Sequence, residues 1–99
     1  METREMNEDG KNVLYISGEI DGTNVDEFEA QLNAFAEKSD EIQLNLSELE
    51  YVSSTGLRVF LTVQKKVKQR GCLMELTNVN EEVMDIFTVT GFVKLLNIV

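Results

Sequence analysis

The stretch that decides the fold is residues 41–57, which read EIQLNLSELEYVSSTGL. It opens with apolar residues at every second position (Ile42, Leu44, Leu46), the pattern of a β-strand with one buried face. Residues 47–55 are mostly polar and are expected to form an ordered loop. Three consecutive hydroxyl residues close this loop, and an apolar stripe with helical spacing follows them at once. The segment is therefore predicted to run strand, loop, helix.

The rest of the chain predicts strands that alternate with helices. Asp9-Gly10 is a turn signal expected to join the first two strands as a hairpin, and Asn24 with Glu27 has the spacing of a helix capping box. The expected strands cover residues 3–7, 12–20, 41–46, 73–76 and 95–98, and the expected helices cover residues 24–38, 54–70 and 80–90. This order predicts a single α/β domain over residues 1–99, with a mixed sheet of four to five strands and helices mainly on one face.

The charge balance excludes several classes of protein. Lys and Arg number 9 and Asp and Glu number 18, which gives a net charge of −9. Such a chain would be repelled by nucleic acid and by anionic membranes, and it favours a partner with a basic face. We therefore expect neither nucleic-acid binding nor insertion into a membrane.

The sequence also lacks most of the residues and motifs that catalysis and metal binding require. The chain has no His, which excludes Ser-His-Asp and Cys-His catalysis and His-ligated metal sites. Cys72 is the single cysteine and is expected to be a small buried apolar residue. There is no GxxxxGK[ST] or GxGxxG motif. We expect no enzyme activity, no cofactor and no metal. An enzyme or nucleotide-binding protein remains a further class of function, in which a nucleotide would make weak contact with the hydroxyl-lined helix start.

The chain carries no signal for membrane targeting. No segment has the length needed to span a bilayer, and the N-terminal residues are polar and acidic, unlike a signal peptide. A cytoplasmic location is expected.

The hydroxyl cluster of Ser53, Ser54 and Thr55 has two interpretations. Ser and Thr are favoured N-caps, because the side-chain oxygen accepts a free backbone N–H of the first turn. A phosphate on the same turn would be stabilised by those N–H groups and by the helix dipole. Phosphorylation would then add about −1.5 to −2 charges without unfolding the domain, which is what a binding switch requires.

Arg58 follows Ser54 by four residues and lies on the same face of the predicted helix. No acidic residue occurs between Glu50 and Glu75, while five of the nine cations do. Most of these cations sit in the last turns of the helix, where they suit its dipole. Arg58 is expected to be either a partner contact or the ion-pair acceptor for a phosphate on Ser54.

Three stretches together resemble a STAS domain, the fold shared by bacterial anti-sigma factor antagonists and the cytoplasmic tails of some anion transporters. They are the strand end at residues 18–21, the strand, loop and helix start at residues 44–57, and the late helix and turn at residues 83–92. The resemblance covers about residues 13–99.

The resemblance implies a phosphorylation switch. Antagonists of this family carry Asp-Ser-Ser/Thr-Gly-Leu, and the Ser after Asp, which matches Ser54 here, takes the phosphate. The kinase is the anti-sigma factor itself, a serine phosphatase reverses the reaction, and the unmodified antagonist captures the anti-sigma factor. The chain departs from the pattern where Ser53 replaces the Asp, so that Ser53 and Thr55 are alternative acceptors.

The resemblance also suggests a partner surface. It places Asp21 and Asn24 beside the helix start, although Asp21 is equally well explained as an ordinary turn carboxylate. The expected partner-binding residues are Asp21, Asn24, Ser53, Thr55, Gly56 and Arg58. The alternative function is a STAS module that binds without being switched, as a subunit of a transporter or another signalling complex.

Overall fold

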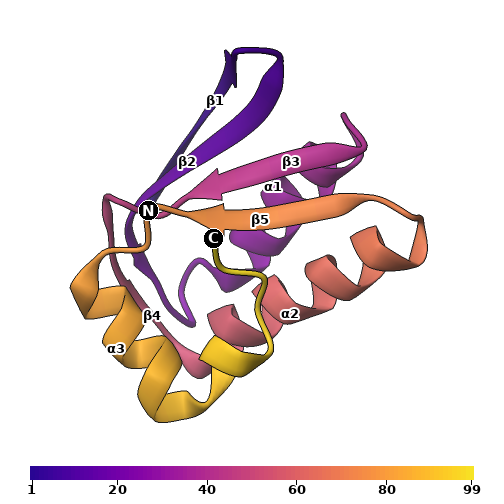
Figure 1. Cartoon of the computed structure of the whole chain (residues 1–99). Coiled ribbons are helices and arrows are strands. Elements are labelled where there is room, and N and C mark those ends of the chain that lie inside the picture. Colours follow the sequence, from indigo (N-terminus) through magenta and orange to yellow (C-terminus); the bar gives the residue numbers. More distant parts are fainter.

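Strands and helices alternate along the chain in a computed structural model that describes all residues, 1–99 (Figure 1). The elements are β1 (Glu2–Glu8), β2 (Lys11–Ile20), α1 (Val25–Ala36), β3 (Glu41–Asn45), β4 (Leu49–Val52), α2 (Ser54–Gln69), β5 (Leu73–Thr77), α3 (Glu81–Thr90) and a short 3-10 turn, η1 (Phe92–Lys94). The three predicted helices and the first four predicted strands are confirmed.

The five strands form one mixed sheet. Its order is β1-β2-β3-β5, and β4 pairs with the far end of β2. The β1–β2 pair is antiparallel and the other pairs are parallel. The predicted hairpin turn is confirmed at Asp9 and Gly10, whose φ values of 53° and 83° are both left-handed. Two such residues match the right-handed twist of the strands that they connect.

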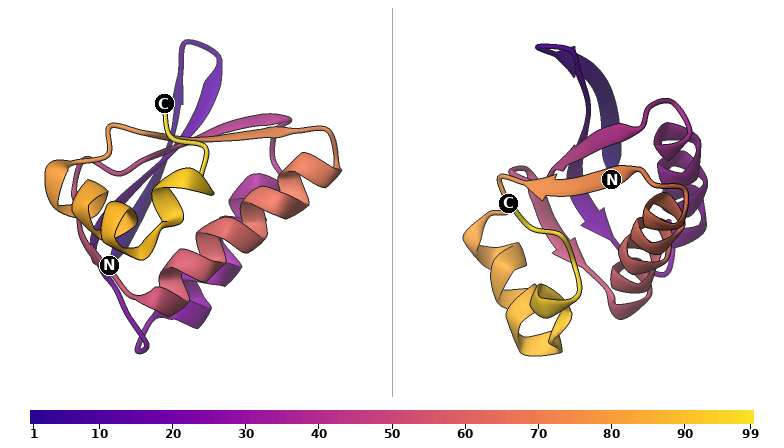
Figure 2. Two further views of the ribbon diagram at one scale, coloured as in Figure 1. Left: turned by 60° about the horizontal axis from the view of Figure 1, so that its bottom comes forward. Right: turned by 45° about the vertical axis from the view of Figure 1, so that its right-hand side comes forward.

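The helices cover one side of the sheet, as predicted. Figure 2 shows α1 and α2 side by side below strands β3 and β5, with α3 on the same side next to them. Phe28, Phe60 and Phe87, one from each helix, are fully buried. Their rings meet edge to face, with centroids 5.1 Å and 6.4 Å apart, which is the favoured geometry for aromatic pairs. This aromatic row joins the three helices in one core.

The predicted loop at residues 47–55 is wrong in its middle, where Leu49–Val52 form strand β4. Burial does not alternate along this stretch, since Leu49 and Val52 are buried while the two residues between them are exposed. Pairing with β2 satisfies the backbone of this segment, and long-range pairing of this kind leaves no local pattern in the sequence.

The predicted last strand at residues 95–98 is also wrong, because the tail makes only one isolated bridge, between Leu76 and Ile98. Side-chain hydrogen bonds hold much of the tail in place of a regular series of backbone hydrogen bonds to β5. The Gln64 amide donates to the carbonyl of Leu95 at 2.8 Å and accepts from the backbone N–H of Asn97 at 2.7 Å. The tail is therefore held along the edge of β5 without forming a regular strand.

The start of α3 is tied to the β3–β4 connection by one side chain. Asn80 is the N-cap of α3 and accepts from the backbone N–H of Val83 at 3.0 Å. Its amide nitrogen also lies 2.6–3.2 Å from three backbone carbonyl oxygens, those of Leu46, Ser47 and Leu49. Asn80 therefore fixes α3 against the segment that leads into β4.

Candidate functional site

Ser53 anchors the start of α2 to the sheet. Its backbone N–H donates to the carbonyl of Ile20, at the end of β2, at 2.8 Å. Its backbone is extended, and its hydroxyl oxygen accepts from the N–H of Gly56 at 3.2 Å. Ser53 is thus the N-cap of α2, and the capping interpretation of the hydroxyl cluster is confirmed for this residue.

The three hydroxyls of the cluster have different surroundings. The Ser53 hydroxyl is half-buried and lies 2.9 Å from the hydroxyl of Thr55, so both are engaged with each other. Ser54, the first residue of α2, is exposed, and its hydroxyl makes no hydrogen bond within the chain. Of the three, Ser54 alone has a hydroxyl without a hydrogen-bond partner in the chain.

Gly56 sets how close the first turn of α2 lies to the sheet. A Cβ at this position would fall 2.7 Å from Cγ2 of Val52 and 2.8 Å from Cγ2 of Ile20. Real Cβ atoms essentially never approach other atoms so closely. Gly56 is buried, so it acts by allowing this packing and does not present a side chain to a partner.

The turn between β2 and α1 is locked by its own side chains. The Asp21 carboxylate accepts from the hydroxyl of Thr23 at 2.5 Å and from its backbone N–H at 2.8 Å. These two bonds, the hydroxyl bond first, hold the pKa of Asp21 below its ordinary value, because they stabilise the charged form. Thr23 was not singled out by the sequence, because only the folded turn brings it to Asp21.

The capping box predicted for Asn24 and Glu27 is wrong. Asn24 precedes α1, but its side chain makes no capping bond. Instead its oxygen accepts from the N–H of Asp21 at 3.0 Å, and its amide donates to the carbonyl of Glu19 at 2.9 Å. These bonds close the turn back onto β2, and they compete with the cap for the same side chain.

The turn and the helix start adjoin each other, because Asp21 directly follows the residue that receives the Ser53 N–H. Arg58 is exposed one turn after Ser54. It takes part in no ion pair, since the one salt bridge in the structure joins Lys38 to Glu5 at 2.6 Å. A guanidinium without a carboxylate partner therefore lies on the exposed side of α2, near the free hydroxyl.

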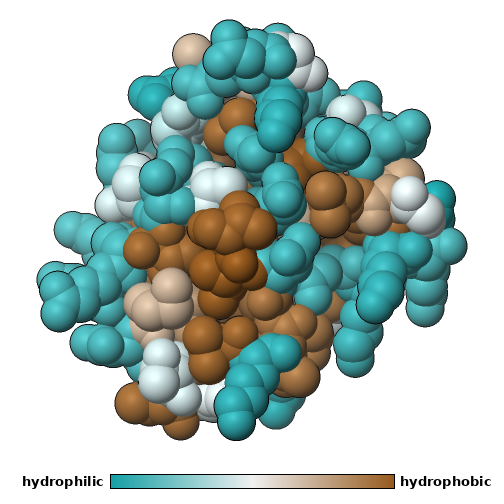
Figure 3. Space-filling view, viewed as in Figure 1, coloured by the Kyte–Doolittle hydropathy of each residue, from teal (hydrophilic) through white to brown (hydrophobic).

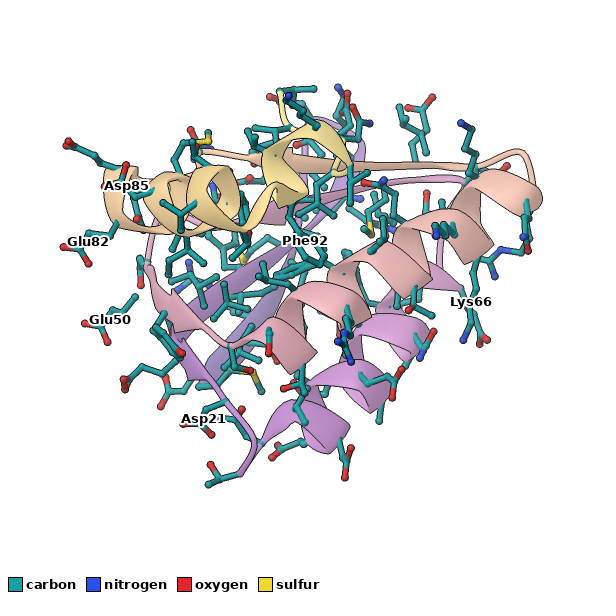
Figure 4. All side chains as sticks on the ribbon, turned by 90° about the horizontal axis from the view of Figure 1, so that it is seen from below. Asp21, Glu50, Lys66, Glu82, Asp85 and Phe92 are labelled. Carbon is teal, nitrogen blue, oxygen red and sulfur yellow. The ribbon has the colours of Figure 1, made fainter.

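Acidic side chains line the side of the molecule beside this helix start. Figure 4 shows Asp21, Glu50, Glu82 and Asp85 projecting outward in a row, from the β2–α1 turn past β4 to α3. An open groove of about 960 Å³ between β4 and α3 carries three of these carboxylates, together with Glu48 and Glu81. No pattern in the sequence indicates this row, because its members come from elements far apart in the chain.

Two further findings bear on function. No group of three or more His, Cys, Asp or Glu side chains is placed to hold a metal ion. None of the helices combines the length and the apolar character that crossing a membrane would need.

Comparison with known proteins gives the family. The chain matches the STAS domain family over residues 3–99. It is 32% identical to BtrV of Bordetella bronchiseptica over 88 residues, which cover 88% of this chain and 76% of BtrV. It is also 32% identical to the anti-sigma-B factor antagonist of Bacillus subtilis over 83 residues, which cover 84% of this chain and 76% of that protein.

Solved structures show the same fold at lower identity. An anti-sigma factor antagonist from Mycobacterium paratuberculosis superposes with a TM-score of 0.83 at 22% identity, over 98% of this chain and 83% of the other. The antagonist SpoIIAA has been solved in both states. Its unphosphorylated form gives a TM-score of 0.76 at 18% identity (99% and 88% covered), and its phosphorylated form gives 0.70 at 17% identity (99% and 91% covered). The chain therefore belongs to the STAS domain family and, within it, to the anti-sigma factor antagonists.

Proposed function

We propose that this antagonist is a switch set by one phosphate on Ser54. With Ser54 unmodified, the chain binds an anti-sigma factor and so frees a sigma factor for transcription. The anti-sigma factor, acting as a serine kinase with ATP, transfers a phosphate to Ser54 and is released, and a serine phosphatase restores the binding form. The observation that carries this proposal is the exposed Ser54 hydroxyl, which is unbonded at the first position of a 16-residue helix.

The geometry favours adding a phosphate without loss of the fold. The Ser54 hydroxyl makes no bond that a phosphate would break, whereas Ser53 caps the helix and Thr55 bonds to Ser53. The first turn of α2 holds no acidic residue. A dianion there meets free N–H groups and the positive end of the helix dipole, which are both stabilising.

The replacement of the family Asp by Ser53 leaves this geometry in place. Asp and Ser are about equally good N-caps, and Ser53 makes the capping bond to the N–H of Gly56. The neutral side chain also removes one negative charge next to the phosphate. The replacement is therefore compatible with Ser54 as the acceptor.

The phosphate acts on the partner and not on the fold. It adds about −1.5 to −2 charges in the middle of a surface that must be dehydrated when the anti-sigma factor docks, and dehydrating a dianion opposes docking. Arg58 is the cation within one turn that a phosphate on Ser54 can pair with. The chain itself supplies no catalytic group, so the chemistry belongs to its partners, and it works in the cytoplasm, where sigma factors act.

The test is a phosphorylation and binding assay with the cognate anti-sigma factor. The wild-type chain is incubated with that protein and ATP, then examined by intact mass and by fragment mapping. One phosphate on Ser54 is expected, none on Ser54→Ala, and one on the control Thr55→Ala. The phosphorylated chain and Ser54→Asp are then expected to bind more weakly than the wild type.

Two results would contradict the proposal. A phosphate found on Ser53 or Thr55, or no phosphate at all, would remove Ser54 as the switch. Unchanged binding by Ser54→Asp, together with capture of membrane-transport proteins, would favour the alternative of a STAS subunit that binds without being switched. If Arg58→Ala altered neither partner affinity nor the effect of phosphorylation, the role given to Arg58 would be wrong.

A further inference from the structure

A β-bulge shapes the surface directly before the phosphate site. β4 pairs with β2 through Gly18↔Leu49 and then through Glu19↔Tyr51, so Glu50 is an extra residue without a partner on β2. A bulge of this kind shifts the alternation of a strand by one residue and re-aims the side chains that follow. Bulges are frequent beside functional sites for this reason.

The bulge turns an aromatic side chain out of the protein. Leu49 and Val52 point into the core at 1% and 2% exposure, and the two residues between them both point outward. Tyr51 is 46% exposed, and its hydroxyl makes no hydrogen bond within the chain. In a regular strand that began with Leu49 inward, Tyr51 would also point inward.

Tyr51 has the properties of an interface anchor. Six large apolar side chains are exposed in the whole chain, and Tyr51 alone of these lies within three residues of Ser54. The core residues on both sides of it fix its backbone, and Tyr has only two rotatable bonds to immobilise. Tyr is one of the residues in which binding energy concentrates.

The surroundings of Tyr51 are acidic. Glu50 precedes it on β4, and Glu19 is its cross-strand partner. Glu50 also lines the groove between β4 and α3, together with Glu82 and Asp85 (Figure 4). None of these carboxylates is in an ion pair. An exposed aromatic side chain that has carboxylates beside it and an acidic groove next to its strand fits a partner whose apolar pocket is bordered by positive charge.

We infer that Tyr51 is the apolar anchor of the anti-sigma factor interface, and that it enters an apolar pocket whose rim carries Lys or Arg side chains facing Glu50, Glu82 and Asp85. This inference rests on the function proposed above and adds the residue that carries the binding energy. It also explains how the switch works. Tyr51, in β4, precedes Ser54, the first residue of α2, by three residues. A partner that takes the Tyr51 ring into its pocket therefore also covers Ser54 and dehydrates any phosphate on it. The anti-sigma factor therefore cannot bind the Tyr51 ring in its pocket while Ser54 carries a phosphate.

The test measures binding of the unphosphorylated chain to its cognate anti-sigma factor by surface plasmon resonance. Tyr51→Ala is expected to bind about 30-fold more weakly or worse, mainly through faster dissociation. Tyr51→Phe keeps most of the affinity, because the ring makes the contact. Leu73→Ala is the control, since Leu73 is 40% exposed but begins β5, just after the end of α2 opposite to Ser54, and it is expected to bind like the wild type.

The carboxylates Glu50, Glu82 and Asp85 are expected to affect the rate of association and not the rate of dissociation. Glu50→Gln and Glu82→Gln are expected to slow association and to make it less dependent on salt, with little change in dissociation. Urea unfolding of each variant checks that the fold is retained. If the wild type binds and a folded Tyr51→Ala binds equally well, the anchor is refuted while the proposed function stands. If the wild type does not bind an anti-sigma factor at all, both fall together.

Discussion

Replacing Gly56 with Ala should loosen the start of α2 by a predictable amount. The added Cβ would lie 2.7 Å from Cγ2 of Val52 and 2.8 Å from Cγ2 of Ile20. Ordinary van der Waals contact begins at 3.4 Å, so the closer pair must move apart by about 0.7 Å. Neither neighbour can swing aside into solvent, because both are buried at the ends of strands, at 2% and 0% exposure.

Two opposing terms set the magnitude. Overpacking a well-packed core costs about 1–3 kcal/mol. Ala in place of Gly favours a helix by at most about 1 kcal/mol, and by less in the first turn than in the interior. The net loss of stability should therefore be about 1 kcal/mol, which lowers the Tm of a domain of this size by about 4–8 °C.

Urea unfolding and calorimetry measure this loss, and Gly22→Ala serves as the control. Gly22 has no atom within 4 Å of an added Cβ and no left-handed φ, so the same substitution there should leave stability unchanged or raise it slightly. If Gly56→Ala proved as stable as Gly22→Ala, the close packing of α2 against β2 and β4 would not be the reason for a glycine at this position.

Three further predictions concern the caps and the turn. Ser53→Ala should lower stability by about 1 kcal/mol through loss of the N-cap, while Ser53→Asp should keep wild-type stability; equal urea midpoints for the two variants would show that the cap is unimportant. Asn80→Asp should be destabilising by about 2 kcal/mol or more, because a carboxylate keeps the cap but can no longer donate to the three carbonyl oxygens that it faces; if Asn80 acted through capping alone, the urea unfolding of the variant would match that of the wild type. Thr23→Val removes the hydroxyl bond to Asp21 and should raise the pKa of that carboxyl toward its ordinary value, as followed by NMR titration. Because the folded-state pKa of Asp21 is lowered, its contribution to stability is present above the unfolded-state pKa and is lost as pH falls through the folded-state pKa, so the variant should lose less stability on acidification than the wild type.

Local patterns predicted most of the fold. The apolar stripes of the three helices, the alternation of Ile42, Leu44 and Leu46, and the Asp9-Gly10 turn each depend on neighbours within a few residues, and each is confirmed. The predictions that failed depend on distant partners. β4 exists because β2 pairs with it, and the tail forms no strand because Gln64 takes part of its hydrogen bonding.

The candidate site divides in the same way. The sequence placed the hydroxyl cluster at a helix start and put Arg58 on the same face as Ser54, since helical spacing alone decides both. It left three hydroxyls as possible acceptors. Their hydrogen bonds separate them, because Ser53 is used as a cap and Thr55 is bonded to Ser53.

By itself, then, the sequence determined the fold class, the acidic character of the surface and the helix start where a phosphate would sit, because periodicity, charge and capping are short-range properties. The tertiary structure alone decided which hydroxyl has no partner, why a side chain at residue 56 is unfavourable, and that Tyr51 points outward beside carboxylates of two strands. Those features depend on the pairing of β4 with β2 and on the packing of α2 against both strands, and such contacts exist only after residues far apart in the chain have come together.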